Sequence, residues 1–210
     1  MISPAARTAT YLFMLILSSA AAADDRGNEP AQHAVLEIDG KTFSIVTGSK
    51  STVDIDGKHR NVVVKISPFK EFDKAGISFR YMGQRHFSYD KLSEAVDHWS
   101  LDGNDTIVMV QRYAVKVTRK EIIDQFRKQF ESMKAGIEQS SVSLKHSKGS
   151  LKGDRLNITL GEIKLSQDIF VIPGKNMTRT FIIQDTNSKS GQNTREFNET
   201  KKLIEKSLNI

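Results

Sequence analysis

Two histidines and two aspartates in the middle of the chain are the residues best suited to acid–base chemistry. His86 and Asp90 are four positions apart, and Asp97 is adjacent to His98. An imidazole beside a carboxylate can act as a general base, so these four residues define a candidate hydrolase site. The five histidines lack the i, i+2 and i, i+4 spacings that place neighbouring imidazoles on one metal. We therefore expect neither a metal nor a cofactor.

The usual signatures of nucleophilic and ion-binding sites are missing from the sequence. It contains no cysteine, no G-x-S-x-G and no H-E-x-x-H. Ser67 and Lys70 have S-x-x-K spacing, but the S-D-N and K-T-G elements of serine–lysine enzymes do not occur. Asp54 opens a stretch like a calcium loop, yet its twelfth position is Lys65, where a bidentate acid is required. These patterns favour a non-catalytic protein.

Positive charge is concentrated in the second half of the chain. Residues 24–110 carry a net charge of −3 and residues 111–210 one of +8. The densest basic stretch, residues 145–155, has no aromatic residue, so it does not favour stacking on single-stranded nucleic acid. It is a candidate site for an anionic polymer or lipid headgroup, with a solvated loop as the alternative. Its anion-binding candidates are Lys145, Lys148, Lys152 and Arg155.

The first 23 residues have the layout of a secretory signal peptide. Arg7 precedes an apolar run from residue 11 to 17, and three alanines end the segment at Ala23. The run is shorter than the ~20 apolar residues that span a bilayer. We expect an exported protein, secreted or periplasmic and of bacterial origin, without disulfides. Four N-x-T sequons would accept glycans only in a eukaryotic secretory route: Asn104, Asn157, Asn176 and Asn198.

After a polar leader over residues 24–33, tight turns between apolar segments predict antiparallel strands. The I-D-G-K tetrapeptide occurs at residues 38–41 and again at 55–58, which predicts a four-stranded meander. A third Asp-Gly pair at residues 102–103 precedes a strand over 106–110. Further strands are expected over residues 76–81, 155–160, 162–165, 169–172 and 178–184, with a Pro173-Gly174 turn before the last.

Three segments have helical spacing. Thr118 and Glu121 form a capping box for a helix over 119–135, whose apolar stripe continues to Ile137, with Gly136 as its C-terminal stop. A closing helix after residue 193 has Asn193 and Glu196 as its capping pair and carries an apolar face. Leu92, Ala95, Val96 and Trp99 favour a short helix within residues 88–99, with a strand entering the third turn as the alternative for the end of that segment.

This order of elements predicts one α+β domain over residues 34–210, with an antiparallel sheet and two helices packed on it. The segment 99–103 leading into 107–110, the capped helix 118–135, and 181–183 followed by a polar loop and helix resemble the PsbP-like superfamily. That resemblance implies an α/β/α sandwich and a non-enzymatic accessory or binding role.

We therefore expect an exported, non-catalytic binding or accessory protein whose partner is an envelope protein or an anionic polymer. The alternatives are a secreted hydrolase that uses the His/Asp residues of 86–98, and a polyanion binder that uses the basic half. The sequence carries no specific nucleic-acid signal, and no apolar segment after the signal peptide is long enough to span a membrane.

Overall fold

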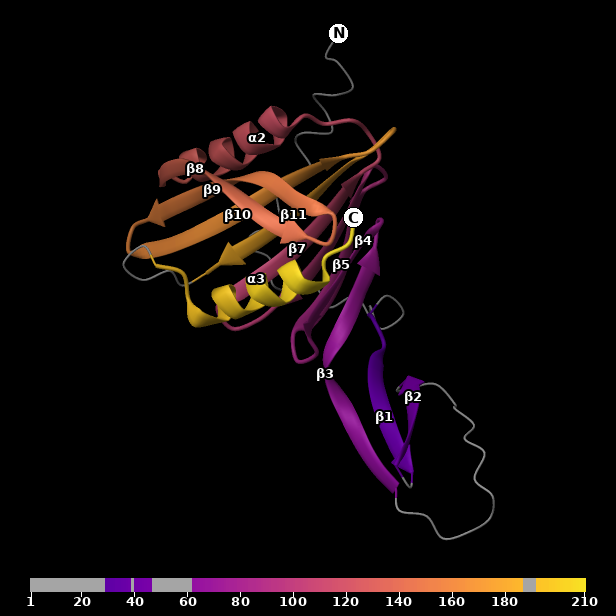
Figure 1. The fold of residues 1–210 in the computed structure, drawn as a ribbon. Helices are drawn as coiled ribbons and strands as arrows, with labels where there is room; N and C mark the ends of the chain where they lie inside the picture. The colour runs from indigo at the N-terminus through magenta and orange to yellow at the C-terminus, as the bar shows by residue number, and fades with distance from the viewer. Residues whose placement is uncertain (1–28, 39, 47–61, 187–191) are drawn as a thin grey trace.

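The fold is known from a computed structural model that describes residues 29–38, 40–46, 62–186 and 192–210. These residues form an α+β fold dominated by antiparallel sheet (Figure 1). The predicted signal peptide and the second I-D-G-K turn lie outside them. None of the described helices is long and apolar enough to cross a membrane. The elements are β1 Gln32–Ile38, β2 Lys41–Val46, β3 Val62–Lys74, β4 Ile77–Met82, β5 His86–Ser93, β6 Val96–Asp102, β7 Thr106–Tyr113, α2 Arg119–Ser132, β8 Gly136–His146, β9 Gly149–Leu160, β10 Ile163–Pro173, β11 Thr178–Asp185 and α3 Arg195–Ser207.

A seven-stranded antiparallel sheet forms the body, in the order β5-β6-β7-β11-β10-β9-β8. Strand β11 lies at its centre, where it pairs with β7 and β10. All but one of its eight residues are buried. A strand is buried on both faces when both faces of its sheet are covered. The strand predicted over residues 178–184 is therefore confirmed, and it is the most enclosed strand of the sheet.

Helix α2 packs on one face of this sheet. The predicted capping box is present, because Thr118 Oγ1 accepts from the Glu121 N–H and Glu121 Oε2 accepts from the Thr118 N–H. The helix ends at Ser132, earlier than predicted. Lys134, two residues further on, takes a φ of +62°. Gly136 is consequently the first residue of β8 and not the end of the helix. The buried residues of α2 and the sheet residues in the same core cluster are Ile122, Ile123, Phe126, Phe130, Leu156, Ile158, Ile169 and Ile182.

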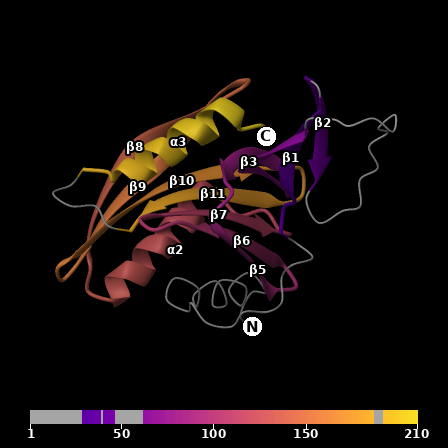
Figure 2. The same ribbon diagram turned by 90° about the horizontal axis from the view of Figure 1, so that it is seen from below.

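The opposite face is covered by α3 together with β4 and the second half of β3, as the view from below shows (Figure 2). Phe197 and Ile204 of α3 are fully buried there. Aromatic rings join the two sheets: Phe79 of β4 stacks on Phe72 at 4.9 Å and meets Phe181 of β11 edge-on at 5.2 Å. The N-cap residue of α3 is Thr194 and not the predicted Asn193, because the Thr194 side chain accepts from the Phe197 N–H.

A second, four-stranded sheet in the order β2-β1-β3-β4 joins an extended arm to this body. The first half of β3 pairs with β1, and its second half pairs with β4. Strands β1 and β2 therefore project away from the seven-stranded sheet (Figure 1). Two sheets thus replace the single sheet expected. The predicted meander is also wrong in order, since β1 lies between β2 and β3. The leader predicted up to residue 33 ends earlier, because β1 begins at Gln32.

Three of the predicted turns are confirmed, although Asp39 of the first lies outside the described residues. Strands β1 and β2 are joined across Gly40, which has a φ of +78°, and Ile38 is paired with Lys41. In the β6–β7 hairpin, the Gly103 N–H donates to the carbonyl of Thr106. The Pro173-Gly174 turn closes β10 and β11 in the same way, through a bond from the Gly174 N–H to Met177.

Three segments differ from the sequence prediction. Residues 88–99 form parts of β5 and β6 with their connecting turn, not a helix. Here Val96 and Trp99 belong to core clusters on opposite faces of the sheet, so their helical spacing is coincidental. The basic stretch expected as a loop is the β8–β9 hairpin, with His146 paired with Gly149. The two strands expected over 162–165 and 169–172 are one continuous strand, β10.

Candidate functional site: a cleft beside helix α3

A cleft of about 700 Å³ opens beside α3, where the end of β4 and the turns after β4 and β6 meet. Its apolar wall consists of Phe69, Met82 and Leu203. Along α3 the lining runs from Arg195 to Lys206, which corresponds to about 16 Å of helix. The remaining polar and charged lining residues are Gln84, Arg85, His86, Asp102, Asn104, Asp105, Glu196, Glu199 and Thr200.

Arg85 forms the floor of the cleft, and its side chain is only 3% exposed. Its Nη1 donates to the Thr106 carbonyl at 2.6 Å. Its Nη2 donates to Glu196 Oε1 at 2.8 Å and to Thr200 Oγ1 at 2.6 Å. Burial lowers the pKa of Arg85, although the Glu196 charge opposes that effect. The guanidinium stays protonated and ties the start of α3 to the β6–β7 hairpin.

Glu196 completes this junction with its second oxygen. Oε2 accepts from the backbone N–H of Asp105 at 2.7 Å, while Oε1 receives Arg85. Glu196 also lies in the first turn of α3, where the partial positive charge of the helix terminus stabilises a carboxylate. Both charged groups on the floor are thus committed to bonds within the protein.

Gly103 allows the turn to close over this ion pair. A Cβ at position 103 would lie 1.9 Å from Glu196 Oε1 and 2.6 Å from Arg85 Nη1. The φ of Gly103 is not in the left-handed region, unlike that of Gly40. Glycine is therefore required at position 103 by close approach and not by the conformation of the turn.

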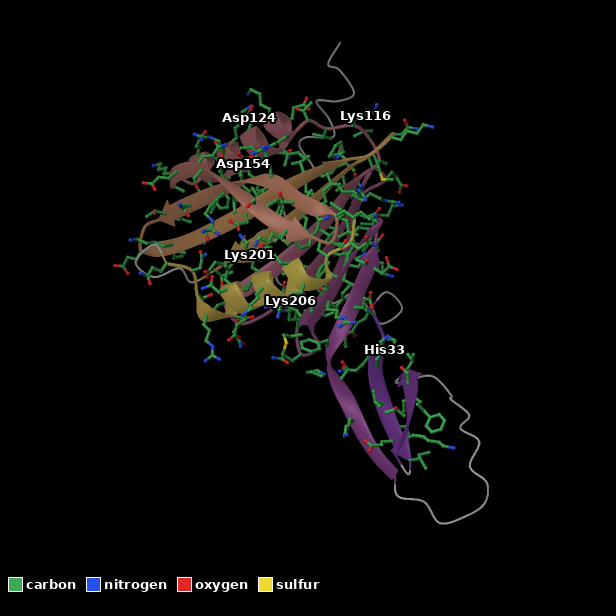
Figure 3. The ribbon with its side chains drawn as sticks, viewed as in Figure 1. His33, Lys116, Asp124, Asp154, Lys201 and Lys206 are labelled. Atoms are coloured by element: carbon green, nitrogen blue, oxygen red, sulfur yellow. The ribbon has the colours of Figure 1, made fainter. Side chains whose placement is uncertain are left out.

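The rim of the cleft is charged and open to solvent. Arg195 and Glu199 form an exposed ion pair at 2.7 Å on the first two turns of α3. Lys206 projects from the last turn of the helix (Figure 3), and His86 is exposed at the start of β5. The cleft thus combines an apolar wall, a neutralised floor and a rim of both signs.

Three of the four residues proposed for catalysis lie on one face of the sheet. Strand register places Asp90 directly opposite His98, and His86 opposite Asp102. Residues two apart share a face, so alternation assigns His86, Asp90 and His98 to the α2 side. His86 is the first residue of β5, at the end of the strand, and from there it also lines the cleft beside α3. His86 is four residues from Asp90, which separates them by about 13 Å along the strand. Only His86 of the four lines the cleft.

His98 is held in one neutral form by its neighbours. Gln111 Oε1 accepts from the Tyr113 hydroxyl at 2.6 Å and from Thr180 Oγ1 at 3.1 Å. This orients the Gln111 amide so that its Nε2 donates to His98 Nδ1 at 3.2 Å, which leaves the ring proton on Nε2. Burial lowers the pKa of His98 to about 4. A base with so low a pKa is poorly matched to proton transfer near neutral pH.

Asp97 points to the other face of the sheet, away from His98. It forms an ion pair with Arg112, and Arg112 Nε donates to its Oδ2 at 2.6 Å. The Tyr89 hydroxyl donates to its other oxygen at 2.9 Å. Asp97 therefore fastens β5 and β7 to β6 on the side opposite the imidazole.

The four cations predicted to bind an anion do not lie together, because the β8–β9 hairpin places them on both faces of the sheet and in its turn. Lys145 and Lys152 share the α2 side of the sheet and are exposed, and Lys148 lies in the turn. Arg155 lies on the α3 side, where its Nε donates to Asp168 Oδ1 at 2.5 Å and its guanidinium stacks on Phe197. Asp168 is fully buried and also accepts from Lys201 of α3. Arg155 is thus part of the contact between α3 and the sheet.

A search of the described residues for three or more His, Cys, Asp or Glu side chains able to hold a metal finds no such group. Comparison of the sequence with protein-family models and with curated proteins finds no match. The site is therefore interpreted from its own geometry.

The central residues of the cleft were not among the sequence candidates. Arg85 and Glu196 are separated by 111 positions, so no local spacing joins them. The one local signal was the Asp-Gly turn at residue 102, which correctly placed a tight hairpin but gave no indication of the buried ion pair beneath it.

Proposed function

We propose that this protein is an exported, non-catalytic binding protein and that the cleft beside α3 holds a short extended segment of a partner protein from the cell envelope. The observation that carries the proposal is that the two charged residues on the floor of the cleft bond to each other and to groups within the protein. Both terminal nitrogens of Arg85 and both carboxylate oxygens of Glu196 form hydrogen bonds within the protein. They fix the shape of the cleft but offer no group for proton transfer, which favours binding over catalysis.

The dimensions and chemistry of the cleft suit a peptide. About 16 Å of helix corresponds to about five residues of extended chain at about 3.3 Å each. Phe69, Met82 and Leu203 can receive an apolar side chain, while Arg195 and Glu199 at the rim can bond to backbone or charged groups of the same segment.

A selection with random short peptides tests this proposal. Peptides are selected on the purified protein and compared on a Leu203→Gln variant, whose apolar wall is weakened. Burial of one leucine contributes about 1.5–3 kcal/mol, so we expect bound peptides to lose affinity by about tenfold or more. Leu92→Gln is the matched control, because Leu92 is also half-buried but lies at the β5–β6 turn. Equal losses in both variants would contradict the proposal.

A further inference from the structure

The outer edge of β8 has the properties of a strand-pairing site. It is one of the two edges of the seven-stranded sheet. Its eleven residues pair with β9 in an unbroken register, without a bulge. Exposed edges are normally protected by lysines, prolines, bulges or covering segments. Between Ile137 and Leu144 the only charged residue is Glu138, and three exposed serines occupy the middle of the strand: Ser140, Ser141 and Ser143.

The opposite edge, β5, is protected in the usual way. Its register shifts between Lys91 and Ser93, which bends the strand and interrupts its pairing. It also carries Asp90 and Lys91 in succession. The contrast between the two edges indicates that the open edge of β8 serves an interaction.

The direction of the free backbone groups follows from one contact. The Lys145 N–H donates to Glu205 Oε1 of α3, away from β9. Backbone groups alternate in direction along a strand, so Gln139, Ser141 and Ser143 also direct their N–H and C=O groups outward. Helix α3 covers only the end of β8 near Lys145. The stretch from Gln139 to Ser143 can accept another strand.

We propose that β8 pairs with β8 of a second copy of this chain, antiparallel and with Val142 at the two-fold axis. Ser141 then exchanges backbone hydrogen bonds with the partner's Ser143, and the symmetric pair does the same. The two seven-stranded sheets become one continuous sheet. Antiparallel association about a two-fold axis closes after two copies, so the product is a dimer and not a fibre.

Charge and polarity select this register. It places Glu138 opposite the partner's His146, on the α3 side of the sheet. His146 Nδ1 accepts from the Lys148 N–H at 3.3 Å, so its ring proton is on Nε2 and can be donated to a carboxylate. Gln139 lies opposite the partner's Lys145 on the other face, where its amide is already bonded to Arg127 and Asp154. Val142 meets the partner's Val142 in an apolar contact. A shift by one residue would place apolar and polar side chains of the two copies on mismatched faces.

Single-cysteine variants test the register, because the chain has no cysteine of its own. At the two-fold axis, Val142→Cys brings two Cα atoms within the roughly 4.4–6.8 Å at which disulfides form. We expect mild oxidation to give a covalent dimer. Ser140→Cys is the matched control on the same face: its counterpart in the partner lies about 13 Å away, so it should remain uncrosslinked. Equal crosslinking of the two variants, or none in Val142→Cys, overturns the register.

Light scattering of the full chain across a concentration series tests the association itself. Ser141→Pro removes an outward N–H that β9 does not use, and Ser141→Lys places a charge on the edge while it keeps the backbone intact. Each should raise the dimer dissociation constant by about tenfold or more, whereas Ser141→Ala should not. A wild-type chain that stays monomeric throughout the series, or variants that dimerise as it does, would refute the proposal.

Discussion

The Arg85 guanidinium and the Glu196 carboxylate meet at 2.8 Å directly beneath Gly103, and this contact unites three parts of the chain. It fixes the first turn of α3 against the β6–β7 hairpin and forms the floor of the cleft. The pair is flanked by backbone partners on both sides, namely the Thr106 carbonyl and the Asp105 N–H. The stability of α3 and the shape of the cleft therefore depend on the same few atoms.

Gly103→Ala is expected to destabilise the protein. The new Cβ would overlap Glu196 Oε1 and Arg85 Nη1, so the hairpin or the ion pair must move. Overpacking of this kind costs about 1–3 kcal/mol. Urea unfolding measures the change. Gly136→Ala is the control, because its Cβ would meet nothing nearer than the Thr159 carbonyl at 4.0 Å. A stable Gly103→Ala variant would mean that the turn is not packed on the ion pair.

Glu196→Gln should be destabilising by about 2 kcal/mol, since it removes the carboxylate bonded to a buried guanidinium and leaves only the charge of Asp102 nearby. Part of the full penalty is avoided because the Glu196 side chain is 26% exposed. In a double-mutant cycle with Arg85→Met, the two changes should couple by about 1–2 kcal/mol. Additive losses, measured by denaturant unfolding of all four proteins, would show that the pair contributes nothing of its own.

His98 should make the protein less stable in mild acid. Its folded pKa is lowered to about 4, below the value of about 6.5 in an unfolded chain, so the unfolded state binds the proton first. Stability is complete above about pH 6.5 and falls as the pH drops towards 4, by up to about 3 kcal/mol. The free energy of unfolding, measured across this pH range, should show that slope.

The control for this pH dependence is His98→Gln, whose amide oxygen can still accept from Gln111 Nε2 but does not titrate. The difference between the two pH profiles isolates the imidazole from the carboxylates that titrate lower. If the slope persists in His98→Gln, another group is responsible for it.

Local patterns in the sequence predicted local structure well. The capping box of Thr118 and Glu121 involves residues three apart, so the same few residues that form it also reveal it. Gly40 likewise confirms its turn through its own φ. In contrast, Leu92, Ala95, Val96 and Trp99 have helical spacing, yet they flank a hairpin turn. Their spacing could not distinguish the two structures, because pairing of β5 with β6 and β7 decides the outcome.

The candidate site could not be predicted because its parts are distant in the sequence. Asp97 and His98 are neighbours in the chain, but alternation along β6 sends them to opposite faces of the sheet. Arg85 and Glu196 are far apart in the chain but bonded in space. Burial also changes chemistry that composition suggests: His98 is a plausible base by residue type, and its buried position makes it a weak one.

The N-terminus of α3 offers a direct comparison between the sequence expectation and the structure. Thr194 Oγ1 accepts from the Phe197 N–H at 3.2 Å, so Thr194 is the cap, whereas Asn193 precedes it. Loss of a capping hydroxyl costs about 1 kcal/mol. We expect that penalty for Thr194→Ala in urea unfolding, no loss for Thr194→Ser, and a change within about 0.5 kcal/mol for Asn193→Ala. Because α3 carries Glu196 to Arg85, Thr194→Ala should also weaken peptide binding in the cleft. A larger loss for Asn193→Ala than for Thr194→Ala would show that the helix begins one residue earlier.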